Sequence, residues 1–291
     1  MNYIERAQCN WSSDSVRLIS TPSPTAKSTF FYVQESGYFK TQPQYFTERS
    51  HLNSYLVVLT LSGKGYLKYN NKNYTLLPKQ AFFIDCMEHH YYETDAVDGW
   101  EIIWVHFNGA SSRGYYTQFI KNCSPVINID ESSSIPVVLN QIVDVQRKKD
   151  MRTEIICSKL IVELLTELLL LSTNLNMSDS FRPAFIQSAM DEMDKRFNEK
   201  ITLDILANKF SVSKFHLSRE FKRFTGTTPN DYLINLRINY AKELLKYSTI
   251  PVAEIAEIVG IGNTSHFINL FKKRTNTTPH AFRSKWKNLK V

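Results

Sequence analysis

The sequence predicts an α+β multidomain protein, with an N-terminal β-barrel or sandwich flanked by helices and a C-terminal domain made of helices alone. Three observations lead to this prediction. Short β-branched and aromatic runs, separated by Gly and Asn turns, fill residues 29–108. An apolar stripe of helical period covers residues 153–171. One helical sequence pattern occurs twice between residues 202 and 279, which indicates an internal repeat.

The length of 291 residues is sufficient for two domains, each able to bury its own core. Residues 172–180 form a polar stretch without periodicity, which is typical of a linker. We therefore expect one domain at residues 1–175 and a second at residues 176–291.

The positive charge belongs to the second domain. The chain has 35 Lys and Arg against 28 Asp and Glu, a formal charge of +7. Residues 181–291 hold 19 of the basic and 10 of the acidic side chains, a net of +9, so the rest of the chain has a net of −2. A basic domain beside a near-neutral one indicates a nucleic-acid binder joined to a domain with another role. A merely soluble basic surface is the alternative that charge alone leaves open.

The spacing of the cysteines indicates that they are reduced thiols. They are far apart in the sequence, and no C-x-x-C pair or histidine at metal-ligand spacing accompanies them. They are Cys9, Cys86, Cys123 and Cys157. Residues 1–20 lack an apolar signal core. The apolar run at residues 160–171 contains Glu163 and Glu167 and is too short to span a bilayer. We therefore expect a cytoplasmic protein without membrane association.

The N-terminal domain is predicted to begin with an irregular arm, because residues 1–28 are polar and have no steady period. Strands are then predicted at residues 55–61, 66–69, 74–77, 81–85 and 100–107. In the last strand the alternation of side chains puts Trp100, Ile102, Trp104 and His106 on one face.

Two helices are predicted after the strands, at residues 135–149 and 153–171. The apolar stripe of the second helix is wider than one small sheet requires. It is therefore either core throughout or partly a dimer face.

The helices of the repeat have clear start and stop signals. Thr202 and Ser213 are predicted N-caps, and Gly226 is predicted to end a helix in the left-handed conformation. Pro229 then begins a long helix that reaches Tyr247. In the second copy helices are predicted from Pro251, over residues 265–274 and from Pro279, with a turn at residues 260–262.

A short helix, a tight turn and a second helix make a helix-turn-helix motif, whose second helix enters the DNA major groove. The helical period predicts that Leu217, Phe221 and Phe224 face the core in the first copy. In the second copy it predicts the same of Phe267, Leu270 and Phe271. The exposed residues predicted to read bases are Phe215, Ser218, Arg219, Ser265, His266 and Asn269. Those predicted to contact phosphate are Lys222, Arg223, Lys272 and Lys273. The role of Ile268, also predicted to be exposed, is left open.

These residue types suit DNA recognition. Arg219 can donate two hydrogen bonds to guanine, and Asn269 can form two with adenine. Lys side chains suit phosphate, which positions a protein without specifying sequence. The alternative for each residue is an ordinary solvated side chain. The 19-residue helix between the copies would be roughly 28 Å long, close to the ~34 Å between successive major grooves.

Residues 182–287 resemble the DNA-binding domain of AraC-family transcription regulators, most specifically at residues 253–260, 265–273 and 278–279. The family usually has Phe where this chain has Ile261, and Gly where it has Asn276. Asn is a tolerated substitute at positive φ, so we expect the turn to form. The resemblance implies a sequence-specific transcription regulator of double-stranded DNA, an activator, a homodimer and a partner of RNA polymerase.

Residues 45–109 resemble the cupin-like sensor domain of the same family, at residues 59–65, 84–91 and 100–109. This resemblance implies a small-molecule effector, most simply a carbohydrate, that contacts Arg49, Tyr91 and Trp104. Ile102 stands where sugar-binding members have a polar residue. An arginine for hydroxyl groups and an indole face for a sugar ring suit such a ligand.

The rival hypothesis is a cupin-type metalloenzyme or isomerase fused to a helical domain. The histidines of this region, His51, His89, His90 and His106, include no H-x-H pair followed by Glu, which a metal site of that type would need. No nucleophile–base arrangement and no Gly-rich phosphate loop is present. We therefore expect no enzyme activity, metal or cofactor. A third hypothesis, an architectural or RNA-binding protein without a sensor, lacks the aromatic platforms that RNA modules use.

Overall fold

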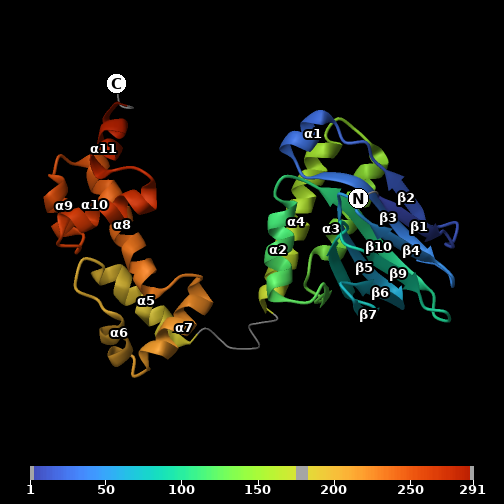
Figure 1. Cartoon of the computed structure of the whole chain (residues 1–291), viewed down its shortest axis with the longest axis horizontal. Helices are drawn as coiled ribbons and strands as arrows, with labels where there is room; N and C mark the ends of the chain where they lie inside the picture. The colour runs from blue at the N-terminus through green and yellow to red at the C-terminus, as the bar shows by residue number, and fades with distance from the viewer. Residues whose placement is uncertain (1–2, 175–182, 289–291) are drawn as a thin grey trace. The chain divides into compact units, whose positions relative to one another are not determined.

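The N-terminal part of the chain forms two β-sheets packed face to face, with helices on the outer side of the larger sheet (Figure 1). The structure is a computed structural model that describes residues 3–174 and 183–288. Its contacts divide the chain into two units, Met1–Ser178 and Asp179–Val291. The predicted boundary between residues 175 and 176 lies outside the described residues. The predicted α+β class, a β-rich domain followed by a helical domain, is confirmed.

The strands pair antiparallel throughout the described sheets. The smaller sheet has the order β1 (Ile4–Gln8), β4 (Phe46–Ser50), β9 (His90–Thr94), β6 (Gly65–Tyr69) and β7 (Lys72–Leu76). The larger has the order β11 (Val126–Asn128), β8 (Gln80–Asp85), β5 (Tyr55–Gly63), β10 (Trp100–Asn108), β3 (Tyr32–Thr41) and β2 (Val16–Ile19).

The strand β10 separates two hydrophobic cores. Trp100, Ile102 and Trp104 belong to the core between the sheets. Ile103, Val105 and Phe107 belong to the core under the helices. Because successive side chains of a strand point to opposite faces, this division is the predicted one.

Four helices accompany the sheets: α1 (Pro24–Thr29), α2 (Ser112–Asn122), α3 (Ile135–Lys148) and α4 (Thr153–Asn174). Most of the apolar stripe of α4 is core, since Leu160, Leu164 and Leu168 are buried against the larger sheet. The opposite side of α4 still exposes Ile155, Val162 and Leu170. No helix of the described residues is long and apolar enough to cross a membrane.

The N-terminal arm is not irregular, which corrects the prediction for residues 1–28. Its first strand, β1, pairs with β4, so that Glu5 lies opposite Arg49. Its second, β2, pairs with β3. All five side chains of β1 are exposed, so the strand has no alternating pattern that the sequence could reveal.

The C-terminal unit consists of seven described helices, and α8 runs from one helix-turn-helix group to the other (Figure 1). They are α5 (Ala184–Arg196), α6 (Leu203–Lys209), α7 (Lys214–Thr225), α8 (Pro229–Tyr247), α9 (Val252–Ile258), α10 (Thr264–Thr275) and α11 (Pro279–Asn288). One core holds α5 to α7 against the start of α8, and a second holds α9 to α11 against its end.

The predicted helix caps are present. The Thr202 and Ser213 side chains accept hydrogen bonds from the backbone N–H groups three residues later. Gly226 and Asn276 end α7 and α10 at φ of 75° and 59°, so Asn serves the second turn as Gly serves the first. The long helix α8 has the predicted limits.

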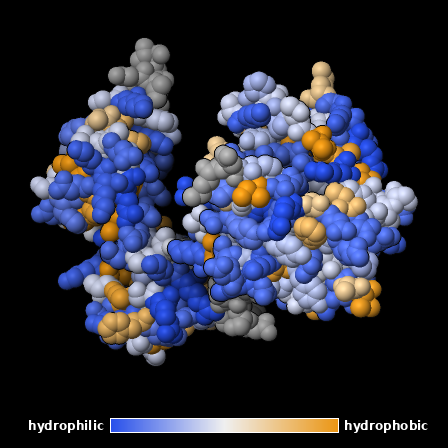
Figure 2. Space-filling view, turned by 45° about the vertical axis from the view of Figure 1, so that its right-hand side comes forward, coloured by the Kyte–Doolittle hydropathy of each residue, from blue (hydrophilic) through white to orange (hydrophobic). Residues whose placement is uncertain are grey.

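Hydrophobic side chains on the surface are scattered. Figure 2 shows a mostly hydrophilic face on which hydrophobic residues form small separate patches. Isolated apolar residues on a surface are ordinary, so each one needs a specific argument before a role is assigned to it. Phe215 on α7 is such a case, because its side chain is 79% exposed on the helix predicted to read DNA.

Candidate nucleic-acid interface and effector cavity

The second helix of each motif, α7 or α10, has one buried and one exposed side. Leu217 and Phe221 of α7 are fully buried, as are Phe267 and Phe271 of α10. On the other side of α7, Phe215, Arg219, Lys222 and Arg223 are exposed; on α10 the exposed residues are Ser265, His266, Asn269, Lys272 and Lys273. The two helices thus present basic and polar side chains at equivalent positions.

Two residues predicted on the exposed side are half-buried. Ser218 lines a groove with Leu206 and Pro229, so its hydroxyl lies at the edge of the reading face. Ile268, at the equivalent position of α10, packs against the second core. Its predicted exposure is therefore wrong, because at this angle around the helix the side chain reaches the neighbouring helices.

Arg219 is held in place by an acidic neighbour. Its Nε lies 3.1 Å from Glu220 Oε1, and Arg223 Nη1 lies 3.2 Å from Glu220 Oε2. Burial alone would raise the pKa of Glu220, but the hydrogen bonds from Arg219 and Arg223 outweigh it and lower the pKa. The carboxylate therefore stays charged and orients Arg219, whose side chain remains 74% exposed to solvent.

The helix α10 is fixed to the start of α8. Arg274 of α10 forms an ion pair with Asp231, which also accepts a hydrogen bond from the Thr228 hydroxyl at 2.8 Å. His266 and Lys273 line a groove between α10 and α8. Since α7 also packs on α8, through Phe221 and Leu233, α8 sets the distance between α7 and α10.

The N-terminal unit encloses a small cavity of about 50 Å³ between its sheets. Arg49, Ile102 and Trp104, three of the four residues predicted to bind the effector, line it. The remaining lining includes residues that the sequence did not single out for this role: Glu5, Trp11, Phe39, Tyr45, Thr47, Tyr92 and His106.

Tyr91, the fourth predicted residue, does not line the cavity, and its neighbour Tyr92 does. The Tyr91 ring stacks on Phe46 at 5.7 Å, and its hydroxyl donates to Glu93 at 2.6 Å. In β9 the side chains of His90, Tyr92 and Thr94 are buried, so Tyr91 points to the outer face. The tyrosine that lines the cavity is therefore Tyr92, one position after the predicted Tyr91.

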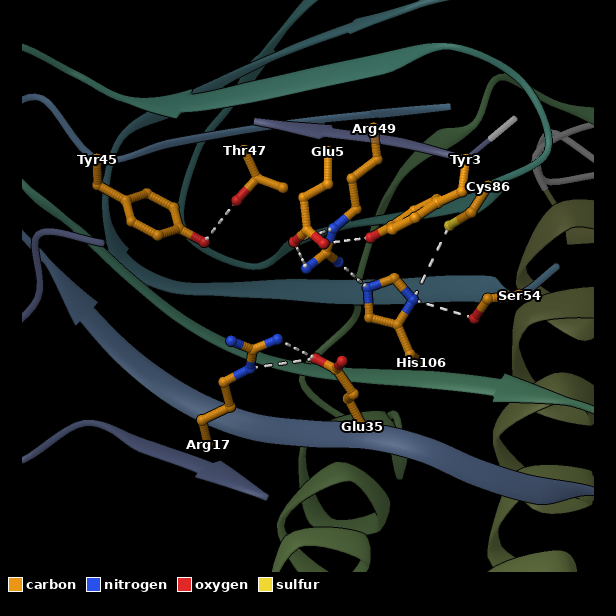
Figure 3. Close-up of polar contacts among 10 residues, drawn as sticks. All are labelled: Tyr3, Glu5, Arg17, Glu35, Tyr45, Thr47, Arg49, Ser54, Cys86 and His106. Atoms are coloured by element: carbon orange, nitrogen blue, oxygen red, sulfur yellow. Dashed lines mark hydrogen bonds and ion pairs between the residues drawn. The ribbon is translucent and has the colours of Figure 1, made fainter. Parts of the chain in front are cut away.

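Arg49 is the centre of a polar network in the cavity (Figure 3). It is 7% exposed, and its Nε and Nη2 both donate to Glu5 Oε1, at 2.9 and 2.7 Å. Burial favours a raised pKa of Glu5, but hydrogen bonds from Tyr3 and Arg49 lower it overall. A second ion pair, Arg17 with Glu35 at 2.9 Å, lies beside the first.

His106 continues this network as a neutral ring. Arg49 Nη1 donates to His106 Nε2 at 2.9 Å, so the proton of the ring sits on Nδ1, which lies 3.0 Å from Ser54 Oγ. Burial and the charge of Arg49 lower the pKa of His106 well below its ordinary value. His106 therefore orients Arg49 without competing for its anionic partner.

The residues of the cavity suit ligand binding better than metal binding. Among residues 3–174 and 183–288 no group of three His, Cys, Asp or Glu side chains could hold a metal ion. Trp104 lines the same cavity, and its indole N–H is buried without a hydrogen-bond partner. A buried donor of this kind favours an occupant with an acceptor oxygen.

Two domain families match the chain. A helix-turn-helix domain matches residues 206–285, and an AraC-like ligand binding domain matches residues 32–155. The HTH-type transcriptional activator RhaS of Salmonella schwarzengrund (strain CVM19633) is 26% identical over 254 residues, which are 83% of this chain and 89% of RhaS.

Other matches cover little more than a third of this chain. The bifunctional transcriptional activator/DNA repair enzyme AdaA of Bacillus subtilis (strain 168) is 39% identical over 111 residues, 38% of this chain and 51% of AdaA. This chain thus matches about half the length of AdaA. The solved C-terminal domain of AraT, a response regulator from Geobacillus stearothermophilus, is 31% identical over 36% of this chain and 88% of that domain, with a TM-score of 0.35.

The two domain matches fall in the two structural units, with the ligand-binding match in the β-rich unit and the helix-turn-helix match in the helical one. The relative that aligns with most of the chain is named as a transcriptional activator, which agrees with a regulator and not with an enzyme. The chain belongs to the AraC family of transcription regulators.

Proposed function

We propose that the chain binds a promoter or operator in the cytoplasm and activates transcription in response to a small molecule. The observation that carries this proposal is the pair of equivalent helices, α7 and α10, with basic and polar side chains on their exposed sides. The two helices differ at the positions that would meet bases. Arg219 in one corresponds to Asn269 in the other, so one monomer should recognise two half-sites of unlike sequence.

The base-reading role of Arg219 has a direct test. Arg219→Ala should weaken binding of the full-length protein to its preferred site by ~1–3 kcal/mol and relax the preference at one base pair. Lys222→Ala, at a predicted phosphate contact, should weaken binding to all sequences alike and reduce the salt dependence. Competition binding assays with specific and random DNA measure both effects.

A third variant controls for the loss of charge alone. Arg196 lies on α5 and not on α7 or α10, and it pairs with Glu192 and Glu199. Arg196→Ala should therefore leave the preference for the specific site unchanged. An equal loss on specific and random DNA for Arg219→Ala would contradict base reading.

The effector is proposed to occupy the cavity lined by Arg49, Ile102 and Trp104. An arginine with an indole face suits a carbohydrate, and binding would shift the population of the N-terminal arm between two arrangements. A thermal-shift screen of the full-length protein against sugars tests this, since a bound ligand raises the stability of the folded state. If no compound raises the unfolding temperature and DNA binding does not respond to cell metabolites, effector control is contradicted.

Two partners complete the proposal. Dimerisation is assigned to the N-terminal unit through the outer side of α4, where Ile155, Val162 and Leu170 are exposed. An activator bound at a promoter would also contact RNA polymerase. Both partners are implied by the family, and the exposed face of α4 supports the dimer contact.

A further inference from the structure

The cavity of the N-terminal unit is closed by β1, the strand that carries Glu5. β1 lies at the edge of its sheet and pairs only with β4. All five of its side chains are exposed, so little apolar surface holds it in place. Figure 3 shows its Glu5 reaching Arg49 from the opposite side to His106. β1 is therefore the part of the cavity wall that can leave most easily.

With β1 in this position the cavity is too small for an effector. Its volume is about 50 Å³. Sites for small molecules are typically ~300–1,000 Å³. Glu5, Ala7, Cys9 and Trp11 supply one wall from the N-terminal arm. Movement of β1, which carries Glu5 and Ala7, would enlarge the cavity while Trp11 stays packed on the core between the sheets.

The charges of the cavity restrict what can take the place of Glu5. Arg49 is buried, and its guanidinium would be left without an anion once Glu5 departs. A buried, unpaired charge is strongly unfavourable. The other carboxylate that lines the cavity, Glu35, is already paired with Arg17. The occupant must therefore bring its own negative charge.

The geometry favours a carboxylate. The planar guanidinium of Arg49 already holds one carboxylate through Nε and Nη2, the arrangement that a ligand carboxylate would reproduce. The buried Trp104 N–H, which has no partner, can donate to a further oxygen of the same ligand. The aromatic rings of Phe39 and Trp11, stacked at 4.3 Å, offer an apolar wall for its body.

We propose that this cavity binds a small organic carboxylate, whose charged group replaces Glu5 on Arg49 and thereby displaces β1. The proposal rests on the proposed effector site and narrows its ligand class. Among carbohydrates it selects a sugar acid over the neutral sugar. Glu5 acts as a built-in competitor, so the position of β1 reports whether the acid is bound.

Matched pairs of acid and neutral compound test the ligand class on the full-length protein. The probes are galacturonate with galactose, glucuronate with glucose, and linear C2–C6 mono- and dicarboxylates with their primary amides. Isothermal titration and thermal shift should detect the acid and not the neutral member of at least one pair. Binding of neutral members only, or of no compound, overturns the proposal.

The competitor role of Glu5 has its own variant. Glu5→Gln removes the anion that the ligand must replace, so the acid should bind about tenfold tighter because the open arrangement is more populated. Glu131→Gln is the matched control. Glu131 pairs with Lys79, away from β1, and does not line the cavity. Equal affinity in Glu5→Gln and the wild type would show that Glu5 does not compete.

Hydrogen exchange measures the displacement itself. The backbone amides of residues 4–8 should lose protection on addition of the acid, while those of β5 and β10 should not. Unchanged protection of β1 with acid bound overturns the displacement. Specific DNA binding is measured on the same samples. If the wild type binds specific DNA but none of the acids, only the carboxylate proposal is refuted. If the wild type does not bind DNA specifically, the proposed function is refuted.

Discussion

His90 shows how one buried side chain ties the stability of the N-terminal unit to pH. Its ring is fully buried in β9, and its Nδ1 lies 3.0 Å from the Glu88 carbonyl oxygen. Burial, offset in part by that hydrogen bond, lowers the pKa of His90 to about 4, and nearby Arg49 acts in the same direction. The folded ring therefore binds fewer protons than the unfolded one between pH 6.5 and 4.

This difference predicts a loss of stability in acid. The contribution of His90 to the free energy of unfolding is complete above pH 6.5, and it falls by roughly 2 kcal/mol when the pH drops from 7 to 5. His90→Asn keeps a donor for the Glu88 carbonyl but cannot titrate. The variant should therefore lose less unfolding free energy between pH 7 and pH 5 than the wild type. Urea unfolding followed by tryptophan fluorescence at both pH values measures this loss.

An exposed neighbour serves as the control for His90. His89→Asn removes a histidine whose side chain is 55% exposed, so the acid sensitivity of the wild type should remain. His106 has a lowered pKa as well, and it should account for the sensitivity that His90→Asn retains. Identical pH profiles for His90→Asn and the wild type would contradict the assignment.

At the scale of the element, the turn of the second motif joins the two helix-turn-helix groups. Gly260 has φ of +75°, and a Cβ at this position would lie 2.2 Å from the Asn198 carbonyl oxygen, which follows α5 of the first group. Beside it, Arg237 of α8 donates to the Phe197 and Glu199 carbonyls at 2.7 Å each. The end of α5, the middle of α8 and the second turn are thus packed together.

A pair of glycine variants separates crowding from backbone strain. Gly262 also has positive φ, +60°, but a Cβ there would meet nothing within 4 Å. Gly262→Ala should cost ~1–2 kcal/mol from φ alone. Gly260→Ala should cost at least ~3 kcal/mol, because the Asn198 backbone must also move. Chemical unfolding of the full-length protein followed by far-UV circular dichroism compares the two, and equal losses would contradict the contact with Asn198.

The elements that the sequence could predict are those whose signals are local. The caps at Thr202, Ser213 and Gly226 act within one turn of the helix, so the helix ends of the repeat follow from the sequence within about two residues. The strand β1 could not be predicted in this way. Its partner lies more than forty residues away, with Glu5 opposite Arg49, and its exposed side chains carry no period.

The effector cavity shows a second limit of sequence patterns. Residues 89–92 read His-His-Tyr-Tyr, so the same chemistry occurs at consecutive positions and does not fix which tyrosine points inward. A shift of one residue moves a side chain to the other face of a strand. Arg49 and Trp104, which were predicted to bind the effector, line the cavity, whereas Tyr92 and Glu5 emerge only once the pairing of β4 with β9 and β1 is known.

At the scale of the whole molecule, one chain carries both reading helices at a distance that its own structure fixes. The helix α8 has 19 residues, so it extends roughly 28 Å. Each reading helix packs on α8, and the packing around Gly260 restrains rotation between the two groups. On the proposed function one monomer would therefore contact two neighbouring major grooves, and the proposed dimer would serve regulation or avidity and not recognition of a single site.

The exposed apolar residues on the outer face of α4 lead to a specific prediction for dimerisation. Ile155, Val162 and Leu170 lie on one side of the helix at a spacing of seven or eight residues and are 57%, 38% and 53% exposed. A second copy of the same helix would bury all three in a symmetric contact. Val162→Glu places a charge at the centre of that contact, so it should raise the dimer dissociation constant at least about tenfold, or ~1.4 kcal/mol.

Analytical ultracentrifugation over a range of protein concentrations measures the change, with Val137→Glu as the matched control. Val137 lies on α3 and is 57% exposed, so the same charge is introduced on a helix that the proposed dimer does not use. A Val162→Glu protein that sediments like the wild type at every concentration would place the dimer contact elsewhere. Because each monomer holds both reading helices, the variant should still bind a single site with unchanged sequence preference while losing the added affinity for two sites on one DNA.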